Sequence, residues 1–199
     1  MSADSAPINL TNHFLIAMPG LQDKLFGRSV VYLCEHSQRG ALGLVINKPC
    51  DISLKNLFDK VELPLVREDL AAAPVFFGGP VQTERGFVLH DATFADAEKP
   101  SDPVYSSTMA IPGGLEMTTS KDVLEAISTG GGPRRVLVSL GYSAWAEGQL
   151  ESELIENSWL TVLADSRLIF DTPVAQRYQQ ALQLLGLEDW MLSPDAGHA

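Results

Sequence analysis

The sequence predicts one domain of mixed α/β class (α+β-like), in which a mixed β-sheet carries packed helices. Short apolar runs bounded by turn residues come first in the chain, and later runs alternate with segments of helical periodicity. This order favours a mixed sheet over a doubly wound parallel sheet. Hydrophobic residues make up 45% and charged residues 20% of the 199 positions, which suits one globular core.

The first half of the chain holds most of the expected strands. We expect strands at residues 13–18, 29–34, 41–46, 75–77 and 86–89, with a hairpin turn at 37–40 and a break at 78–80. The strands at 29–34 and 41–46 are apolar at nearly every position, so both faces of the sheet should be covered. Ser53 is a good N-cap for a helix that ends at Lys60, and residues 62–74 should be loop or weakly helical.

The second half alternates strands with helices. Strands are expected at 108–111, 115–117, 136–140, 159–163 and 168–170, and residues 141–146 should form a turn. One helix should begin at Thr119, with Asp122 completing a capping box. A second helix should span residues 147–157, and a third should begin at Thr172–Pro173 and end at Gly186.

We expect the domain to span residues 13–192, between a flexible N-terminus (1–12) and a flexible C-terminus (193–199). The first nine residues lack the basic start and apolar run of a signal peptide. No apolar stretch approaches the roughly 20 residues that span a bilayer. Cys34 and Cys50 are best explained as free thiols in a reducing compartment. These observations predict a cytoplasmic protein that does not enter a membrane.

The charge distribution argues against direct nucleic-acid binding. The net charge is −11, and residues 101–199 carry 5 basic and 13 acidic side chains. Nucleic-acid affinity depends largely on Lys and Arg at phosphates, and the longest basic run here is Arg134–Arg135. The sequence also lacks a phosphate-binding GxxxxGK loop, a GxGxxG fingerprint, an HExxH pair and a CxxC pair. We therefore predict no cofactor and no metal site.

Cys34 and His36 are the candidate catalytic residues. On a regular strand they would point to the same face, where the imidazole could activate the thiol as a nucleophile or redox centre. A small buried cysteine beside a polar residue at the strand end explains the same pattern and is the favoured interpretation.

Three other segments have a chemical and a structural interpretation. The segment 141–145 lies where a nucleophile elbow would, but it lacks the second glycine, and His198 is the only later histidine. Glu147 and Glu151 lie one turn apart on a predicted helix and suit acid–base chemistry or a cation, although the helix dipole also favours them. The hydroxyls and lysine at 118–121 suit an anion, but ordinary capping explains them better.

Polar residues at strand ends complete the set of candidates. His90 closes the strand at 86–89, and Asn47 with Lys48 closes the strand at 41–46. Functional sites are often built at such ends, which are also where strands reach water.

The chain resembles the AlgH/YqgE family of bacterial proteins over about residues 13–190. The resemblance rests on residues 13–20, 29–36, 40–49, 77–81, 85–90, 119–124, 141–142, 145, 148–151 and 157–160, all in the same order. It implies a single mixed α/β domain with no established enzyme activity or cofactor, and members are often labelled as transcriptional regulators. Ser143–Ala144 and Ala146 stand where members more often have Ala-Gly and Gly, so the bulkier segment argues against close backbone approach to a ligand there.

Our leading hypothesis is a non-enzymatic binding or regulatory protein, with an unknown protein or small molecule as partner and an indirect effect on transcription. The predicted ligand-binding residues are His36, Asn47, Lys48, His90, Tyr142, Trp145 and Glu151. The alternatives are a thiol-dependent enzyme or redox protein using Cys34 with His36, and a DNA-binding regulator, which the charge disfavours.

Overall fold

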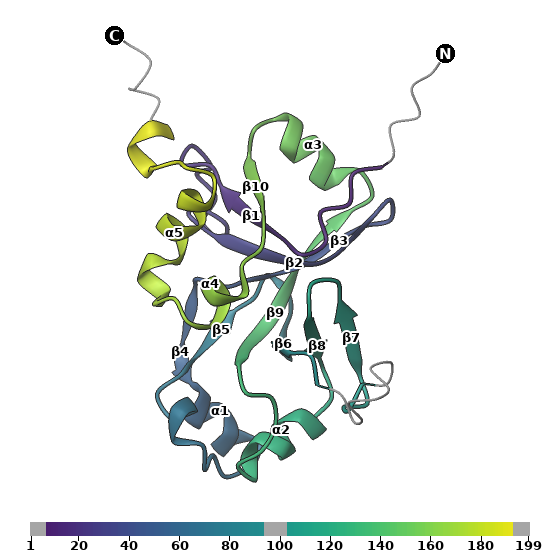
Figure 1. Cartoon of the computed structure of the whole chain (residues 1–199), viewed down its shortest axis with the longest axis vertical. Helices are drawn as coiled ribbons and strands as arrows, with labels where there is room; N and C mark the ends of the chain where they lie inside the picture. Colours follow the sequence, from purple (N-terminus) through teal and green to yellow (C-terminus); the bar gives the residue numbers. More distant parts are fainter. Residues whose placement is uncertain (1–6, 94–102, 193–199) are drawn as a thin grey trace.

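The computed structural model describes residues 7–93 and 103–192 and confirms a mixed α/β fold in a single domain (Figure 1). The strands are β1 (His13–Ala17), β2 (Val30–Ser37), β3 (Gly40–Val45), β4 (Pro49–Ser53), β5 (Pro74–Phe77), β6 (Val81–Asp91), β7 (Thr108–Ile111), β8 (Leu115–Thr118), β9 (Val136–Ala146) and β10 (Trp159–Leu163). The helices are α1 (Leu54–Lys60), α2 (Asp122–Ser128), α3 (Gln149–Ile155), α4 (Ser166–Phe170) and α5 (Arg177–Leu184). Short 3₁₀ segments lie at Glu68–Leu70, Val174–Gln176 and Asp189–Leu192.

Strand β9 joins the two halves of the curled sheet. The strand order is β10-β1-β2-β3-β9-β6-β8-β7, and β4 and β5 form a side branch on β9. Residues 136–142 of β9 pair with β6, and residues 143–146 pair with β3. The pairing of β5 with β9 is parallel and the other pairings are antiparallel, so the sheet is mixed.

Glycines allow two backbone segments to cross at the middle of β9. A Cβ atom on Gly79 would lie 2.2 Å from the carbonyl carbon of Tyr142, and one on Gly141 would lie 2.4 Å from the carbonyl oxygen of Gly79. Both glycines have positive φ angles, 155° and 74°, that L side chains rarely adopt. Only glycine therefore fits at this crossing, where β9 passes from one half of the sheet to the other.

The sheet buries apolar side chains on both faces, as the sequence predicts. In β2, Tyr32 and Cys34 enter the central cluster inside the curl, whereas Val31 and Leu33 enter a second cluster on the outer face. Helix α3 covers this second cluster with Leu150. A third cluster lies on the outer face of the other half of the sheet, under α1 and α2.

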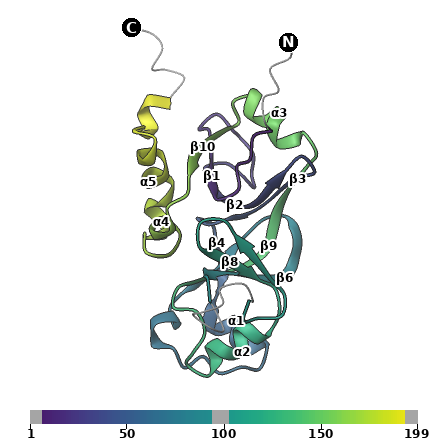
Figure 2. The same cartoon turned by 45° about the vertical axis from the view of Figure 1, so that its right-hand side comes forward.

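Helices α4 and α5 close the central cluster from one side (Figure 2). The Tyr178 hydroxyl of α5 donates to the carbonyl of Ala17 at 2.6 Å. The guanidinium of Arg177 donates to the carbonyls of Ile46 and Thr172 and lies over the ring of Phe76, and burial lowers its pKa to about 10. Helix α5 is therefore attached to the sheet through backbone carbonyls.

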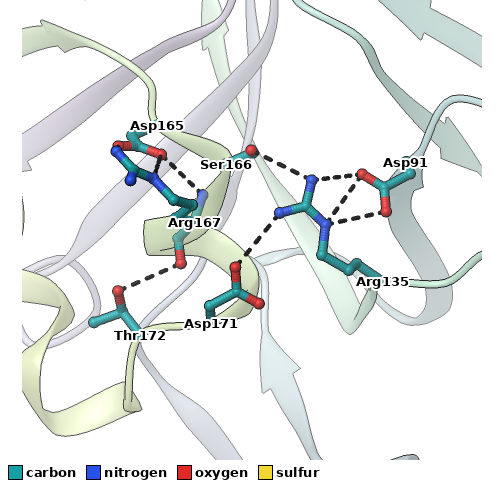
Figure 3. Close-up of polar contacts among 7 residues, drawn as sticks. All are labelled: Asp91, Arg135, Asp165, Ser166, Arg167, Asp171 and Thr172. Atoms are coloured by element: carbon teal, nitrogen blue, oxygen red, sulfur yellow. Dashed lines mark hydrogen bonds and ion pairs between the residues drawn. The ribbon is translucent and has the colours of Figure 1, made fainter.

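Arg135, the residue that precedes β9, attaches α4 to the sheet (Figure 3). Arg135 donates to the Asp91 carboxylate from Nε and Nη2, with a shortest distance of 2.7 Å. Its other contacts reach Ser166 and Asp171 at the two ends of α4, and its guanidinium lies over Phe170. The positive charge of Arg135 is thus paired with the carboxylates of Asp91 and Asp171.

Several predicted elements are wrong in type or extent. Residues 168–170 belong to helix α4 rather than a strand, because Asp165 caps the Arg167 N–H and turns Leu168 and Ile169 into the core. Residues 141–146 continue β9 rather than turning, because their edge pairs with β3. Strand β4 was not expected; its residues are mostly half-buried or exposed.

The helix expected at Thr119 begins at Asp122 instead. The Asp122 carboxylate accepts hydrogen bonds from Ser106 and Ser120, and no side chain caps the helix. By contrast, α1 has the predicted Ser53 cap, in a reciprocal box with Asn56.

Residues 7–12, placed in the flexible N-terminus by the sequence, contact the domain. Leu10 is buried in the second cluster, and Asn12 accepts a hydrogen bond from the Tyr32 hydroxyl. The other residues of the two predicted flexible ends, 1–6 and 193–199, lie outside the described residues.

We expect Gly79→Ala to lower the free energy of unfolding by about 3 kcal/mol or more, because its Cβ would overlap the Tyr142 backbone. Gly86→Ala in β6 is the matched control, since a Cβ there meets no atom within 4 Å and the cost should stay within about 0.5 kcal/mol. Urea unfolding of both variants provides the comparison. Equal stabilities would contradict the role assigned to the crossing.

Candidate functional site

Cys34 and His36 do not form a catalytic pair. A β-bulge between Leu33 and Glu35 breaks the alternation of β2, so the prediction that the two side chains share a face is wrong. Cys34 packs in the central cluster and is 2% exposed. Burial, with a smaller contribution from the charge of Glu35, raises the pKa of its thiol and disfavours the thiolate.

His36 faces the opposite cluster, where both ring nitrogens have partners. Nδ1 accepts the backbone N–H of Leu10 at 2.9 Å, and Nε2 lies 2.7 Å from Oε1 of Glu151 on α3. Because a backbone N–H can only donate, Nδ1 carries no proton and the neutral ring donates from Nε2. His36 therefore fastens residues 7–12 and α3 to β2, and no ring nitrogen is left to bind a ligand.

Glu151 of α3 is the hydrogen-bond partner of His36. Burial would raise the pKa of Glu151, but hydrogen bonds from its own backbone N–H and from His36 outweigh burial and lower it. Glu147, its predicted companion, is exposed before the start of α3. The two carboxylates thus do not form an acid–base pair on the helix.

Trp145 is buried beside Trp159, and both indoles use the same acceptor. Their Nε1 atoms donate to Oε2 of Glu153 at 2.9 and 2.7 Å. Glu153 was not among the residues predicted from the sequence to have a functional role. A buried indole N–H needs an acceptor, and this requirement could have indicated an acidic partner for the two tryptophans.

Asn47 and Lys48 lie at the end of the β2–β3 hairpin opposite to His36. The Asn47 side chain accepts from the Val30 N–H and donates to the Arg28 carbonyl, both at 2.9 Å, and so continues the ladder beyond the strand. Lys48 donates to the Leu25 carbonyl at 2.5 Å, and burial lowers its pKa despite the nearby charge of Asp23. Both side chains hold the segment that precedes β2.

His90 is fully buried in β6, in the other half of the sheet. Its Nδ1 donates to the Asp91 carbonyl at 2.7 Å and its Nε2 lies 2.8 Å from the Thr118 hydroxyl, which is also bonded to Thr108. Burial lowers the pKa of His90, although the Asp91 carbonyl and the charges of Glu116 and Asp91 partly oppose it. The neutral ring is therefore part of a closed hydrogen-bond chain.

The predicted residues therefore do not converge on one cleft. His36, Trp145 and Glu151 gather under α3, Asn47 and Lys48 lie at the far end of the hairpin, and His90 lies across β9. Tyr142, the remaining member, packs its ring against Phe87 with 5.3 Å between centroids.

A cleft of about 230 Å³ lies between α1, α2 and the outer face of β6, β8 and β9; we call it the α1–α2 cleft. Its apolar lining comprises Leu57, Val61, Val88, Leu124, Val138 and Leu140. Its rim comprises Glu84, Thr118, Thr119, Ser120 and Lys121, which include the segment with a possible anion-binding role. Gly86 also lines the cleft, and the space where its Cβ would lie is open.

A second hollow, of about 210 Å³, lies over the β2–β3 turn. It is lined by Glu35, Ser37, Arg39, Gly40, Ala41, Leu42 and Trp145, most of which are exposed or half-buried. Apolar surface with a few convergent polar groups is the usual character of ligand sites, which favours the α1–α2 cleft.

Within residues 7–93 and 103–192, no three His, Cys, Asp or Glu side chains are grouped so that they could hold a metal ion. None of the helices in these ranges has the length and apolar character needed to cross a membrane.

Comparison with known proteins identifies relatives along the whole chain. The AlgH-like family model matches residues 14–190. UPF0301 proteins from Albidiferax ferrireducens and Variovorax paradoxus are 79% and 76% identical, each over the full length of both chains. The solution structure of the AlgH protein from Pseudomonas aeruginosa is 44% identical, with a TM-score of 0.74 over 98% of each chain. A Corynebacterium diphtheriae crystal structure, 19% identical with a TM-score of 0.68, covers 89% of this chain and 87% of its own and shares the fold.

We expect one of the two thiols to react with 5,5′-dithiobis(2-nitrobenzoate) in the native protein at pH 7.5. Burial raises the pKa of both thiols, but Cys50 is only half-buried, whereas Cys34 is buried in the core and should react only in denaturant. Cys50→Ser should abolish the native reaction and Cys34→Ser should leave it intact. Rapid labelling of Cys34 in folded Cys50→Ser would contradict its assignment to the core.

We expect the free energy of unfolding to decrease as the pH is lowered below about 6.5, in part because of His90. The pKa of folded His90 is lowered, so the unfolded chain takes up its proton first and acid favours unfolding. Replacing His90 with Gln should flatten the slope by up to about 1.4 kcal/mol per pH unit. Thr108→Val, which breaks the hydroxyl chain but keeps the histidine, should lower stability with an unchanged slope. Equal slopes in His90→Gln and wild type, from urea unfolding at pH 5–7, would refute the contribution.

Proposed function

The chain belongs to the AlgH-like family, and from its structure we propose that it is a non-enzymatic protein that binds a small ligand in the α1–α2 cleft and has a regulatory role through that binding. The observation that carries the proposal is the incomplete covering of the outer sheet face. Leu57 of α1, Leu124 of α2 and Leu140 of β9 line the cleft and are only half-buried. A ligand that removes their surface from water gains affinity from the hydrophobic effect.

The chemistry of the other candidates supports binding over catalysis. The thiol of Cys34 is buried, and both nitrogens of His36 are used in structural hydrogen bonds. The sequence-based hypothesis of a pocket at His36, Asn47, Lys48 and His90 is therefore replaced by the α1–α2 cleft.

An indirect route suits a regulatory role. The net charge of −11 opposes contact with nucleic-acid phosphates, so we propose that any effect on transcription passes through the ligand or another protein. Cys34 and Cys50 are free thiols, which supports placing the protein in the reducing cytoplasm.

We expect 1-octanol, a neutral apolar probe, to bind in the cleft. A titration followed by ¹⁵N–¹H NMR should shift the amide signals of Gly86, Val88 and Leu124. Gly86→Leu should weaken this binding at least about tenfold, because its side chain would occupy the space that is open above β6.

Gly20→Leu is the matched control. Gly20 lies in an exposed turn, and a Cβ there also meets no atom within 4 Å, so octanol binding should be unchanged. Perturbed signals confined to another surface, or equal affinity in folded Gly86→Leu and wild type, would overturn the assignment of the site.

A further inference from the structure

We propose that the ligand of the α1–α2 cleft is a small amphipathic anion, whose apolar body lies on the cleft floor and whose carboxylate or phosphate group meets Lys121 and Arg85. This inference rests on the proposed binding function and specifies its ligand class. The cleft volume of about 230 Å³ is below the roughly 300–1,000 Å³ of pockets for drug-sized ligands, so the apolar body is small.

The floor of the cleft is shaped for an aliphatic or small aromatic body. Val88 and Val138 form its buried base on the sheet, and Gly86 leaves a gap beside them. Gly86 and Val88 are two residues apart on β6 and so present the same face, on which the missing side chain at position 86 opens the cleft. A larger residue at position 86 would have completed the apolar layer.

Lys121 at the rim and Arg85 beside it have no carboxylate partner among the described residues. Lys121 lines the cleft and makes no ion pair with any described residue. Arg85 donates to two neutral oxygens, at 3.3 Å to the Thr119 hydroxyl and at 3.4 Å to the side-chain carbonyl of Gln82. The Arg85 guanidinium also lies 5.9 Å from the centre of the Phe87 ring, so it reaches the cleft through Thr119 and is not part of the lining. A bound anion at Thr119 would have Lys121 and Arg85 as charge-assisted hydrogen-bond donors.

Two acidic side chains, Asp122 and Glu84, lie near these cations, and their contacts differ. The Asp122 carboxylate accepts three hydrogen bonds, from the Ser106 N–H and from the hydroxyls of Ser106 and Ser120, which satisfy its charge within the loop. Glu84 is the one carboxylate among the residues that line the cleft. Lys121 and Glu84 balance each other among the residues that line the cleft, and Arg85 beside Thr119 adds a second positive charge at the rim.

The ligand class can be tested with three probes that share an eight-carbon chain: octanoate, 1-octanol and octylammonium. We expect octanoate to bind the wild-type protein at least about tenfold more tightly than octanol, and octylammonium to bind most weakly. The preference for octanoate should shrink as salt is raised, because the two cations are solvent-exposed. NMR titration gives the dissociation constant of each probe.

Lys121→Gln should remove most of the difference between octanoate and octanol, and Arg85→Gln should reduce it. Lys60→Gln is the matched control, since Lys60 is an exposed lysine of α1 that does not line the cleft. Equal binding of octanoate and octanol, or tighter binding of octylammonium, would overturn the anionic ligand while leaving the cleft as a binding site. Failure of all three probes to shift the cleft signals would overturn the proposed function as well.

Discussion

The close crossing of Gly78–Gly79 with residues 141–143 of β9 is the constraint on which the rest of the fold depends. A Cβ on Gly78 would lie 2.3 Å from the Gly141 carbonyl oxygen, and one on Gly79 would overlap Tyr142. The contact lets β9 pair with β5 and β6 in its first part and with β3 in its second. One strand thus holds both halves of a sheet whose curl encloses the central cluster and leaves two outer faces for helices to cover. The α1–α2 cleft lies on one of these outer faces.

Polar side chains in this fold mostly replace missing backbone partners. Asn47 extends the ladder of β2 past the end of β3, Arg177 reaches the Ile46 carbonyl, and His36 accepts from Leu10. A curled sheet with irregular entries leaves backbone groups unpaired at its edges, and an unpaired buried group is costly. No buried side-chain nitrogen or oxygen of the described residues lacks a partner, which shows how completely this need is met. Side chains whose polar atoms already bond to the backbone are poor candidates for binding a ligand.

This use of polar residues explains how far the sequence was informative. Strand positions and the Ser53 cap depend on local pattern, and most were predicted within a few residues. The β-bulge at Cys34 and the continuation of β9 through residue 146 depend on partner strands that are distant in sequence, so local alternation misplaced Cys34 relative to His36. Three apolar residues at 168–170 fit a strand or a helix equally well, and only the Asp165 cap decides between them. The sequence predicted functional sites at strand ends because polar residues occur there both in binding sites and where a side chain bonds to the backbone or reaches water.

The α1–α2 cleft was not apparent from the sequence because it depends on the missing side chain of Gly86. In the sequence, Gly86 is a glycine that would weaken a strand. Whether it opens a cleft depends on the sheet face on which it lies and on the helices that cover that face. Helices α1 and α2 have seven residues each, too few to cover the sheet between them completely. The segment 118–121 was noticed for its hydroxyls and its lysine, but the expected cap at Thr119 does not form, since Asp122 bonds with Ser106 and Ser120 instead. That arrangement leaves Lys121 at the edge of apolar surface rather than paired with an acid. Selection for stability alone would favour a β-branched side chain at position 86. An open position beside a lysine that has no ion-pair partner among the described residues is better explained by a ligand.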